Sequence, residues 1–177
     1  ISLREVIELE GVHRVGQSRL IAIVIQVCGA LQFAHDQNVL HLDIKPDNIM
    51  TGDYGEVYLF DWGISERLYS SSKKSSRPSL RGTPAYMSPE QARGICELTV
   101  ESDVFSLGSL LYELCTKKRP FSGSSNSELL QKIRAGALDL HVEWEILPTP
   151  LREIISKAMQ LVPNERYSSA KELSLAL

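Results

Sequence analysis

The sequence predicts a mainly helical α+β domain that contains one small β-hairpin. The first observation is a run of apolar residues at helical spacing between residues 18 and 37. The second is a stretch from 38 to 64 in which short β-rich runs alternate with turn residues. The third is the return of helical patterns after Pro89. We therefore expect apolar helices at 18–37 and 102–117 in the centre, with the hairpin on one face.

The composition is that of one globular domain or a large piece of one. The chain has 177 residues, 43% of them hydrophobic and 23% charged, and a formal net charge of −3. It is long and apolar enough to bury a core, and it has no basic stripe of the kind that binds nucleic acid. Cys28, Cys96 and Cys115 form no CxxC pair, which excludes a zinc ribbon and favours the reducing cytoplasm.

Two further features concern the whole protein. The longest apolar stretch, 20–31, is interrupted at Gln26 and is too short to span a bilayer, so no transmembrane segment is predicted. The chain begins at Ile1 without Met or a signal-peptide pattern. We therefore expect a piece of a longer cytoplasmic protein, whose other segments could anchor it to a membrane.

In the first half of the chain, a short amphipathic segment at 2–9 precedes the long apolar helix. Ser18 is the expected N-cap of that helix, which is apolar nearly all round and so belongs in the core. Residues 51–55 have the composition of a hairpin loop. The β-rich runs around this loop are 39–40, 48–50 and 57–60.

Further along the chain, residues 64–80 are rich in Ser, Lys and Arg and predict a surface loop. Helices are then expected at 102–117, 127–135, 151–160 and from 169 to the end. Thr149-Pro150 offers a cap followed by a first-turn proline. Ser169 to Glu172 has the pattern of a capping box.

Several motifs of other enzyme classes are absent or incomplete. The stretch 11–18 imitates a P-loop, but Gln17 stands where the phosphate-binding lysine is needed. There is no GxGxxG, HExxH or GxSxG, and the four histidines lack the i, i+4 spacing of a helical metal pair. Glycine-rich nucleotide flaps, helical zinc sites and serine hydrolases are therefore not supported.

One constellation carries chemistry. The sequence His41-Leu42-Asp43-Ile44-Lys45-Pro46-Asp47-Asn48 is followed, thirteen residues after Asn48, by Asp61-Trp62-Gly63. If the hairpin folds back, two carboxylates, an amide and a lysine converge, a set suited to phosphoryl transfer with Mg²⁺. Taken singly, Asp43 and Asp47 read equally well as turn residues, and Asp61 as the end of a strand.

Taken together, these residues resemble the catalytic loop (HRDxKPxN) and metal loop (DFG) of protein kinases. Residues 82–90 resemble the kinase segment that ends in APE, here SPE. Residues 101–108 resemble the central helix of the large lobe, and 163–167 the arginine-bearing stretch near its end. The run GTPAYMSPEQARG looks most like bacterial members, the eukaryotic-like serine/threonine kinases.

The resemblance implies a protein-kinase-like fold of which this chain is the large helical C-lobe with a small β-hairpin. Residues 1–177 would be this part of the catalytic domain, with the activation segment at 61–90. The N-lobe, with its glycine-rich loop and strand lysine, is absent, so we expect little or no activity from the chain alone. Exposed apolar surface is expected where the N-lobe would dock.

The resemblance also assigns catalytic roles. Asp43 would accept or orient the proton of the acceptor hydroxyl, and Lys45 would support charge on the γ-phosphate. Thr83 would approach both and shape the site for a serine or threonine. The implied partners are ATP, a protein substrate with such an acceptor, and the N-lobe of the parent chain.

The implied cofactors are ATP and Mg²⁺. Asn48 and Asp61 would ligate the metal, Lys45 would contact the nucleotide phosphates, and Met50 would form part of the floor under the adenine. Four further residues are assigned supporting, structural roles. These are His41, Glu90, Asp103 and Arg166, of which Glu90 and Arg166 would form an ion pair and Asp103 would hold the catalytic-loop backbone.

The sequence departs from the family pattern at Leu42, which replaces the arginine of HRD. That arginine commonly receives a phosphate carried by the activation loop, so we expect activity that does not depend on this contact. Trp62 in place of Phe should be tolerated. Candidate phosphorylation sites in the loop are Ser70, Ser71, Ser72, Ser75, Ser76 and Ser79.

Two functions remain open at the level of the sequence. The first is a Mg-ATP-dependent serine/threonine protein kinase. The second is a pseudokinase, a binding scaffold that keeps the fold without turnover, which Leu42 and the absent N-lobe motifs favour. The joint presence of Asp43, Lys45, Asn48 and Asp61 favours the enzyme, because a scaffold has no chemical need for all four.

Overall fold

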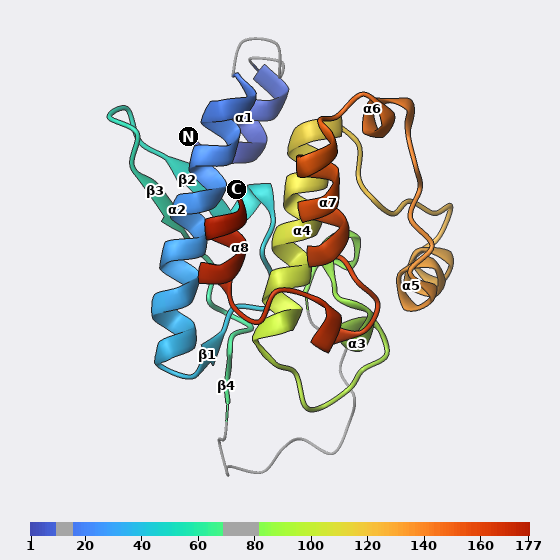
Figure 1. Cartoon of the computed structure of the whole chain (residues 1–177). Coiled ribbons are helices and arrows are strands. Elements are labelled where there is room, and N and C mark those ends of the chain that lie inside the picture. The colour runs from blue at the N-terminus through green and yellow to red at the C-terminus, as the bar shows by residue number, and fades with distance from the viewer. Residues whose placement is uncertain (10–15, 69–81) are drawn as a thin grey trace.

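The computed structural model describes residues 1–9, 16–68 and 82–177. These residues form a helical body with two short antiparallel pairs of strands (Figure 1). The helices are α1 (Leu3–Leu9), α2 (Gln17–Asp36), α3 (Pro89–Ala92), α4 (Val100–Thr116), α5 (Asn126–Ala135), α6 (Val142–Glu145), α7 (Thr149–Ala158) and α8 (Ala170–Ala176). The strands are β1 (Val39–Leu40), β2 (Ile49–Thr51), β3 (Val57–Leu59) and β4 (Glu66–Arg67). Three 3₁₀ turns complete the described elements: η1 (Pro46–Asn48), η2 (Pro84–Tyr86) and η3 (Pro163–Glu165).

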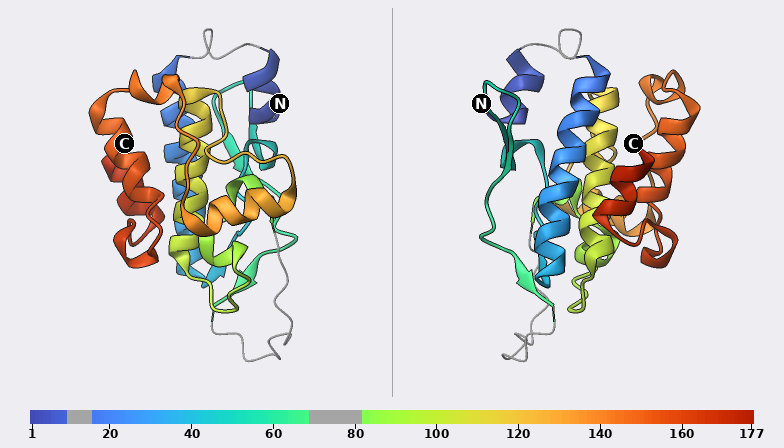
Figure 2. Two further views of the ribbon diagram at one scale, coloured as in Figure 1. Left: turned by 90° about the vertical axis from the view of Figure 1, so that its right-hand side faces the viewer. Right: turned by 60° about the vertical axis from the view of Figure 1, so that its left-hand side comes forward.

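Helix α4 lies at the centre of the body, between α2 and α7 (Figures 1 and 2). Fourteen of its 17 residues are buried. The sequence predicts that the helix at 18–37 is buried nearly all round. That expectation is wrong in part, because one face of α2 is exposed. Phe33 of α2 is 71% exposed, so α2 presents one face to the core and another outward.

Helix α2 contacts the last helix, α8, so that the two halves of the chain pack against each other (Figure 2). The sequence predicts no transmembrane segment, because the apolar stretch 20–31 is too short to span a bilayer, but the whole of α2 is long and apolar enough to cross a membrane by length and composition alone. Eight of its residues, including Val24, Val27 and Leu31, are buried. In the part of the chain that the structure describes, its contacts with α4, α8, β1 and β3 make it a core helix.

Helices α4 and α7 approach each other closely at Gly108. A Cβ at this position would lie 2.6 Å from Cγ of Met159 and 2.9 Å from Cβ of Ala158, closer than such atoms can come. Gly29 in α2 is different, because an added Cβ would meet nothing within 4 Å. Glycine is therefore required at the first position by packing and not at the second.

The predicted hairpin is confirmed. Strands β2 and β3 pair antiparallel, with Ile49 opposite Leu59 and Thr51 opposite Val57. Just outside the register, the N–H of Phe60 donates to the carbonyl of Asn48 over 2.8 Å. The hairpin thus brings the residue before β2 next to the residues that follow β3.

The other strand pair lies partly within the stretch expected as a loop. Strand β4, at Glu66–Arg67, pairs antiparallel with β1. A loop from residue 64 onward is therefore wrong for these two residues, because backbone hydrogen bonds to β1 order a polar segment that carries no apolar pattern of its own. Residues 69–80 of that loop lie outside the described residues.

The helix caps agree only in part with the sequence. Ser18 lies inside α2, which begins at Gln17 after Gly16, and Thr149 is the first residue of α7 rather than its cap. Ser169 does cap α8, accepting from the N–H of Glu172 over 3.0 Å. In a regular capping box the Glu172 carboxylate would accept from the N–H of Ser169. Here it accepts from the N–H of Ser168 at 2.7 Å, one residue earlier.

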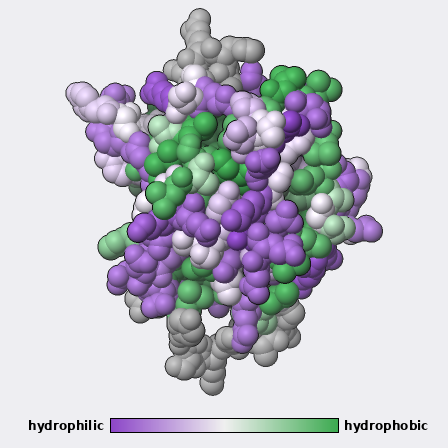
Figure 3. All heavy atoms as spheres, in the orientation of Figure 1, coloured by the Kyte–Doolittle hydropathy of each residue, from purple (hydrophilic) through white to green (hydrophobic). Residues whose placement is uncertain are grey.

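Besides Phe33, exposed apolar side chains lie on the hairpin and around α6, among other places. On the hairpin, Met50, Tyr58 and Phe60 are exposed. On and around α6, Val142 and Ile146 are exposed, and Figure 3 shows apolar residues gathered at its upper right, where Figure 1 places this helix. The sequence predicts exposed apolar surface where an N-lobe would dock, and that the hairpin side chains form this surface stays a prediction.

Candidate active site

The loop at 41–48 is held by one buried carboxylate. Asp103, fully buried on α4, accepts from the N–H of His41 at 2.9 Å and from the N–H of Leu42 at 2.8 Å. His35, at the end of α2, adds a contact from Nε2 at 2.8 Å. These contacts hold Leu42 at φ +68°, a left-handed conformation that side-chain-bearing residues avoid. Asp103 therefore sets the course of the backbone into Asp43.

Three side chains meet beyond this turn. Nζ of Lys45 donates to Oδ2 of Asp43 and to Oγ1 of Thr83, both at 2.8 Å. The N–H of Thr83 donates to Oδ1 of Asp43 over 2.7 Å. Each oxygen of the Asp43 carboxylate thus has a donor, and the three residues that the sequence singled out as catalytic form one connected group.

Asp43 is held in its ionised form. Burial raises the pKa of its carboxyl, but the hydrogen bonds from Lys45 and Thr83 and the charge of Lys45 outweigh burial, so the pKa lies below its ordinary value. The carboxylate is therefore available as a proton acceptor at neutral pH.

Asn48, at the end of η1, contacts the same carboxylate from the other side. Its Nδ2 donates to the carbonyl of Asp43 at 2.8 Å and to Oδ2 at 3.1 Å. With the amide nitrogen committed to Asp43, the side-chain oxygen of Asn48 is left as an acceptor for a cation. This orientation fits the donor set of a Mg²⁺ site.

Asp61 follows β3 at φ +60° and is exposed. Its Oδ1 accepts from the N–H of Gly63 at 3.3 Å, and the hydrogen bond between Phe60 and Asn48 brings this turn to the Asn48 side of the loop. Among the described residues, no group of three or more His, Cys, Asp or Glu could hold a metal by itself. A Mg²⁺ ion here would thus need phosphate oxygens and water besides Asn48 and Asp61.

His41 fastens the same turn. Its Nδ1 accepts from the N–H of Asp43 at 3.2 Å, so Nε2 carries the proton and donates to the carbonyl of Phe60 at 2.9 Å. The ring also contacts Trp62 edge-on, with centroids 4.5 Å apart. The structural role expected for His41 is thus to connect the 41–48 loop to the turn at Asp61.

Met50 lies on β2 and is 40% exposed. It forms a β-bridge with Ser2, and Thr51 bonds the backbone of Ile1. Met50 is thus partly exposed and lies beside the first residues of the chain. Its role under an adenine stays a prediction.

Glu90 and Arg166 form the expected ion pair. The guanidinium donates to the two carboxylate oxygens at 2.7 and 2.9 Å, and both side chains are buried. Ser102 also donates to Glu90, at 2.7 Å. Burial raises the pKa of Glu90, but the hydrogen bonds and charge of Arg166 outweigh it and lower the pKa overall.

A second ionic group beside the loop was missed by sequence reasoning. Arg4 of α1 donates to Glu113 of α4 at 2.9 Å and to the hydroxyl of Tyr86 at 2.6 Å, and it lies 3.5 Å from Asp47. The Tyr86 hydroxyl in turn donates to Glu113 at 2.5 Å. The motifs contain Tyr86 and Asp47, but no local pattern connects them to an arginine at position 4, because the contact is entirely tertiary.

Gln91 was also missed. Its Nε2 donates to the carbonyl of Leu42 at 2.9 Å, while its Oε1 accepts from the N–H of Ser88 at 3.0 Å. Leu42 itself, which stands in the place of the family's arginine, is buried. The candidate phosphorylation sites, from Ser70 to Ser79, lie outside the described residues.

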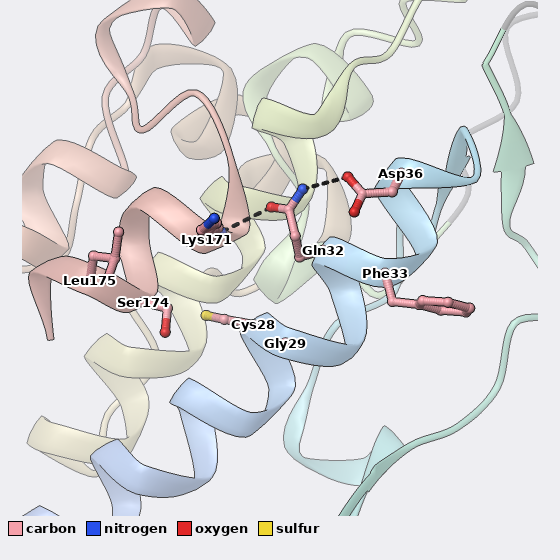
Figure 4. A pocket seen from close by; sticks show the side chains of 8 residues that line it. All are labelled: Cys28, Gly29, Gln32, Phe33, Asp36, Lys171, Ser174 and Leu175. Atoms are coloured by element: carbon pink, nitrogen blue, oxygen red, sulfur yellow. Dashed lines mark hydrogen bonds between the residues drawn. The ribbon is translucent and has the colours of Figure 1, made fainter.

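A groove of about 380 Å³ lies between α2 and α8 (Figure 4). It is lined by Cys28, Gly29, Gln32, Phe33, Asp36, Lys171, Ser174 and Leu175. None of the residues around Asp43 takes part in it. The groove is therefore separate from the candidate active site.

Residues 2–175 match the family described as protein kinase domain. The serine/threonine-protein kinase PknB of Mycobacterium tuberculosis is 34% identical over 175 residues, which are 98% of this chain and 28% of that protein. The serine/threonine-protein kinase PknD of Protochlamydia amoebophila is 32% identical over 179 residues, covering 87% of this chain and 18% of that protein. A probable serine/threonine-protein kinase of Corynebacterium efficiens is 35% identical over 191 residues, covering 99% of this chain and 27% of that protein.

The chain thus spans less than a third of the length of these relatives, and almost all of it takes part in the match. The matched region includes the connected group Asp43, Lys45 and Thr83 and the buried pair Glu90 and Arg166. The chain belongs to the protein kinase family, among the bacterial serine/threonine kinases of the eukaryotic-like type.

Proposed function

We propose that this chain carries the acceptor-binding and metal-binding half of a Mg-ATP-dependent serine/threonine protein kinase. The observation that carries the proposal is the connected group around Asp43. Lys45, Thr83 and Asn48 all donate to its carboxylate within 3.1 Å. The relatives' names support the same reaction class.

In this reaction the hydroxyl oxygen of a serine or threonine forms a bond to the γ-phosphorus of ATP. The bond between that phosphorus and the β,γ-bridging oxygen breaks, and ADP leaves. The hydroxyl proton passes to the Asp43 carboxylate, which is unprotonated before transfer because the contacts of Lys45 and Thr83 lower its pKa. The carboxylate also orients the hydroxyl before transfer.

Lys45 supplies positive charge beside the transferred group. Its ammonium has one remaining proton to donate after the bonds to Asp43 and Thr83. A γ-phosphate oxygen in that position would gain an electrostatic contact that strengthens as charge develops.

Thr83 fixes the other edge of the acceptor site. Its N–H and hydroxyl hold Asp43 and Lys45 at a set spacing. A short aliphatic hydroxyl reaches Asp43 in such a site more readily than the longer tyrosine side chain does.

Asn48 and Asp61 would hold Mg²⁺. The ion, when bound, neutralises charge on the phosphate oxygens of ATP. The side-chain oxygen of Asn48 and the carboxylate of Asp61 supply the hard oxygen ligands on the protein side. Asn48 is oriented for this by its two hydrogen bonds to Asp43.

The chain would act within a longer protein whose N-lobe supplies the glycine-rich loop and the strand lysine. ATP would lie between that lobe and the exposed face of the hairpin, with Met50 under the adenine. The chain alone is proposed to have little or no activity, because positioning of ATP provides most of the catalysis in this reaction class.

The test is the intact mass of a form extended upstream by the length of an N-lobe, after incubation with ATP and Mg²⁺. We expect phosphate additions in the wild type and none in Asp43→Asn or Asp61→Asn. Asp53→Asn, in the exposed turn of the hairpin, is the matched control and should behave as the wild type. Equal additions in all four forms would contradict the proposed roles. No additions in any form would favour the pseudokinase scaffold.

A further inference from the structure

The carbonyl and the N–H of Leu42 are both held by side chains from distant segments. The N–H donates to Asp103 of α4 at 2.8 Å, and the carbonyl accepts from Gln91 of α3 at 2.9 Å. Leu42 itself has φ +68°, a left-handed conformation that is unfavourable for a residue with a Cβ. The two contacts therefore hold a backbone conformation that Leu42 would not adopt by itself.

The same carbonyl is approached by the chain that leads into Thr83. Gly82 has φ +107°, and a Cβ there would lie 2.7 Å from the Leu42 oxygen. Immediately after it, the N–H of Thr83 donates to Asp43. Residues 82–91 thus touch the 41–48 loop at three neighbouring points, through Gly82, Thr83 and Gln91.

The oxygen and the nitrogen of the Gln91 side-chain amide contact different segments. Oε1 closes the capping box of α3 by accepting from the N–H of Ser88 at 3.0 Å. Nε2 leaves the helix and donates to Leu42. Gln91 is 4% exposed and Leu42 2%, so loss of this donor leaves the buried Leu42 carbonyl without that bond.

We propose that Gln91 is a positioning residue for the reaction. Its amide holds the Leu42 carbonyl in place. This contact orients the neighbouring Asp43 carboxylate toward Thr83 and Lys45. The contact couples the segment at 82–91 to the 41–48 loop through a neutral hydrogen bond and needs no arginine at position 42. Its catalytic consequence rests on the proposed function, whereas the coupling itself does not.

The decisive variant is Gln91→Glu. A glutamate keeps the oxygen that caps α3, because Glu suits this place in a capping box as well as Gln does, but it has no donor for Leu42 at neutral pH. As the pH falls and the carboxyl becomes protonated, it regains one proton to donate. Ser88→Ala is the matched control, since it removes the cap and leaves the Leu42 contact intact.

The readout is amide hydrogen exchange by NMR on the full chain, with Leu107 of α4 reporting whether the fold persists. In Gln91→Glu at pH 7 we expect the protection factors of the Thr83 and Leu42 amides to fall at least about tenfold, with partial recovery near pH 5. Gln91→Met should show the same loss without recovery. Ser88→Ala should leave both amides within about twofold of the wild type.

Unchanged protection at Thr83 in Gln91→Glu would overturn the proposal, and so would an equal loss in Ser88→Ala. In the extended form, Gln91→Glu should lower kcat about tenfold and leave KM for ATP unchanged. A change in KM alone would also overturn it. If the extended wild type has no activity, the proposed function is contradicted. The exchange measurement still tests whether Gln91 couples the segment at 82–91 to the 41–48 loop.

Discussion

Arg166 and Glu90 meet through two parallel hydrogen bonds of 2.7 and 2.9 Å, although 76 residues separate them in the chain. The same guanidinium also donates to the carbonyls of Gln160, Leu161 and Glu101. One buried side chain therefore joins α3, the start of α4 and the approach to η3. Its charge is balanced by Glu90 alone among these partners.

Breaking this pair is expected to be costly. Arg166→Met should lower the free energy of unfolding by about 3–5 kcal/mol, because it leaves the Glu90 carboxylate buried without a cationic partner, although Ser102 still donates to it. Urea denaturation measures the change. Lys157→Met is the control, since its pair with Glu172 is 3.7 Å long and half exposed and should cost at most about 1 kcal/mol. Equal effects of the two changes would contradict the prediction.

The pH dependence of stability should reflect the same pair. The pKa of Glu90 is lowered in the fold from an unfolded value near 4.5, so its ionised form stabilises the protein above that pH. This contribution should be lost as the pH falls through the folded pKa. In Glu90→Gln the free energy of unfolding should vary less steeply below pH 4.5 than in the wild type, as measured by urea titrations at each pH. A slope unchanged by this substitution would count against the assignment.

The two helix glycines predict opposite responses to alanine. Gly108→Ala should destabilise the fold by about 1–3 kcal/mol, because its Cβ would overlap Met159 and Ala158. Gly29→Ala should stabilise it by roughly 0.5–1 kcal/mol, because the space is open and alanine favours helix. Thermal unfolding of both variants gives the comparison. Shifts of the same sign would show that the close approach of α4 and α7 is not the deciding factor.

The hydroxyl of Thr83 is expected to matter to turnover. Thr83→Ala removes the 2.8 Å contact to Lys45, a hydrogen bond to a charged group, and should lower kcat roughly 10- to 100-fold in the extended form. Thr83→Ser keeps the hydroxyl and should retain most of the activity. Steady-state kinetics with a peptide acceptor tests both. A serine variant as impaired as the alanine variant would assign the effect to packing of the methyl group.

Much of the architecture was predictable because it depends on local pattern. The apolar spacing of Leu20, Val24 and Leu31 predicts α2, and the β-rich runs around a glycine-containing turn predict the hairpin. The caps were less predictable. Gly16 rather than Ser18 precedes α2, and nothing in the sequence decides between two neighbouring residues that can both begin a helix.

Some residues of the candidate site were likewise predictable from the sequence and others were not. Asp43, Lys45 and Asn48 lie within one loop, and the family motif is enough to group them. Thr83 joins them through a segment about 40 residues later, which the motif also suggested. Arg4 and Gln91 could not be assigned, because their contacts depend on where α1 and α3 come to rest against the loop. Short polar contacts between distant segments leave no periodic trace in a single sequence.

The burial of Asp103 has a consequence for the order of folding. Its partners His35, His41 and Leu42 are 61 to 68 residues away in the chain, on the other side of the hairpin and the segment at 82–91. The 41–48 loop therefore cannot acquire its shape from its own sequence, and a peptide of that loop with α2 and the hairpin would not reproduce it. Only when α4 has docked against α2 is the carboxylate in place to bend the backbone at Leu42. The loop is thus shaped for chemistry only in a chain in which α2 and α4 are already packed together.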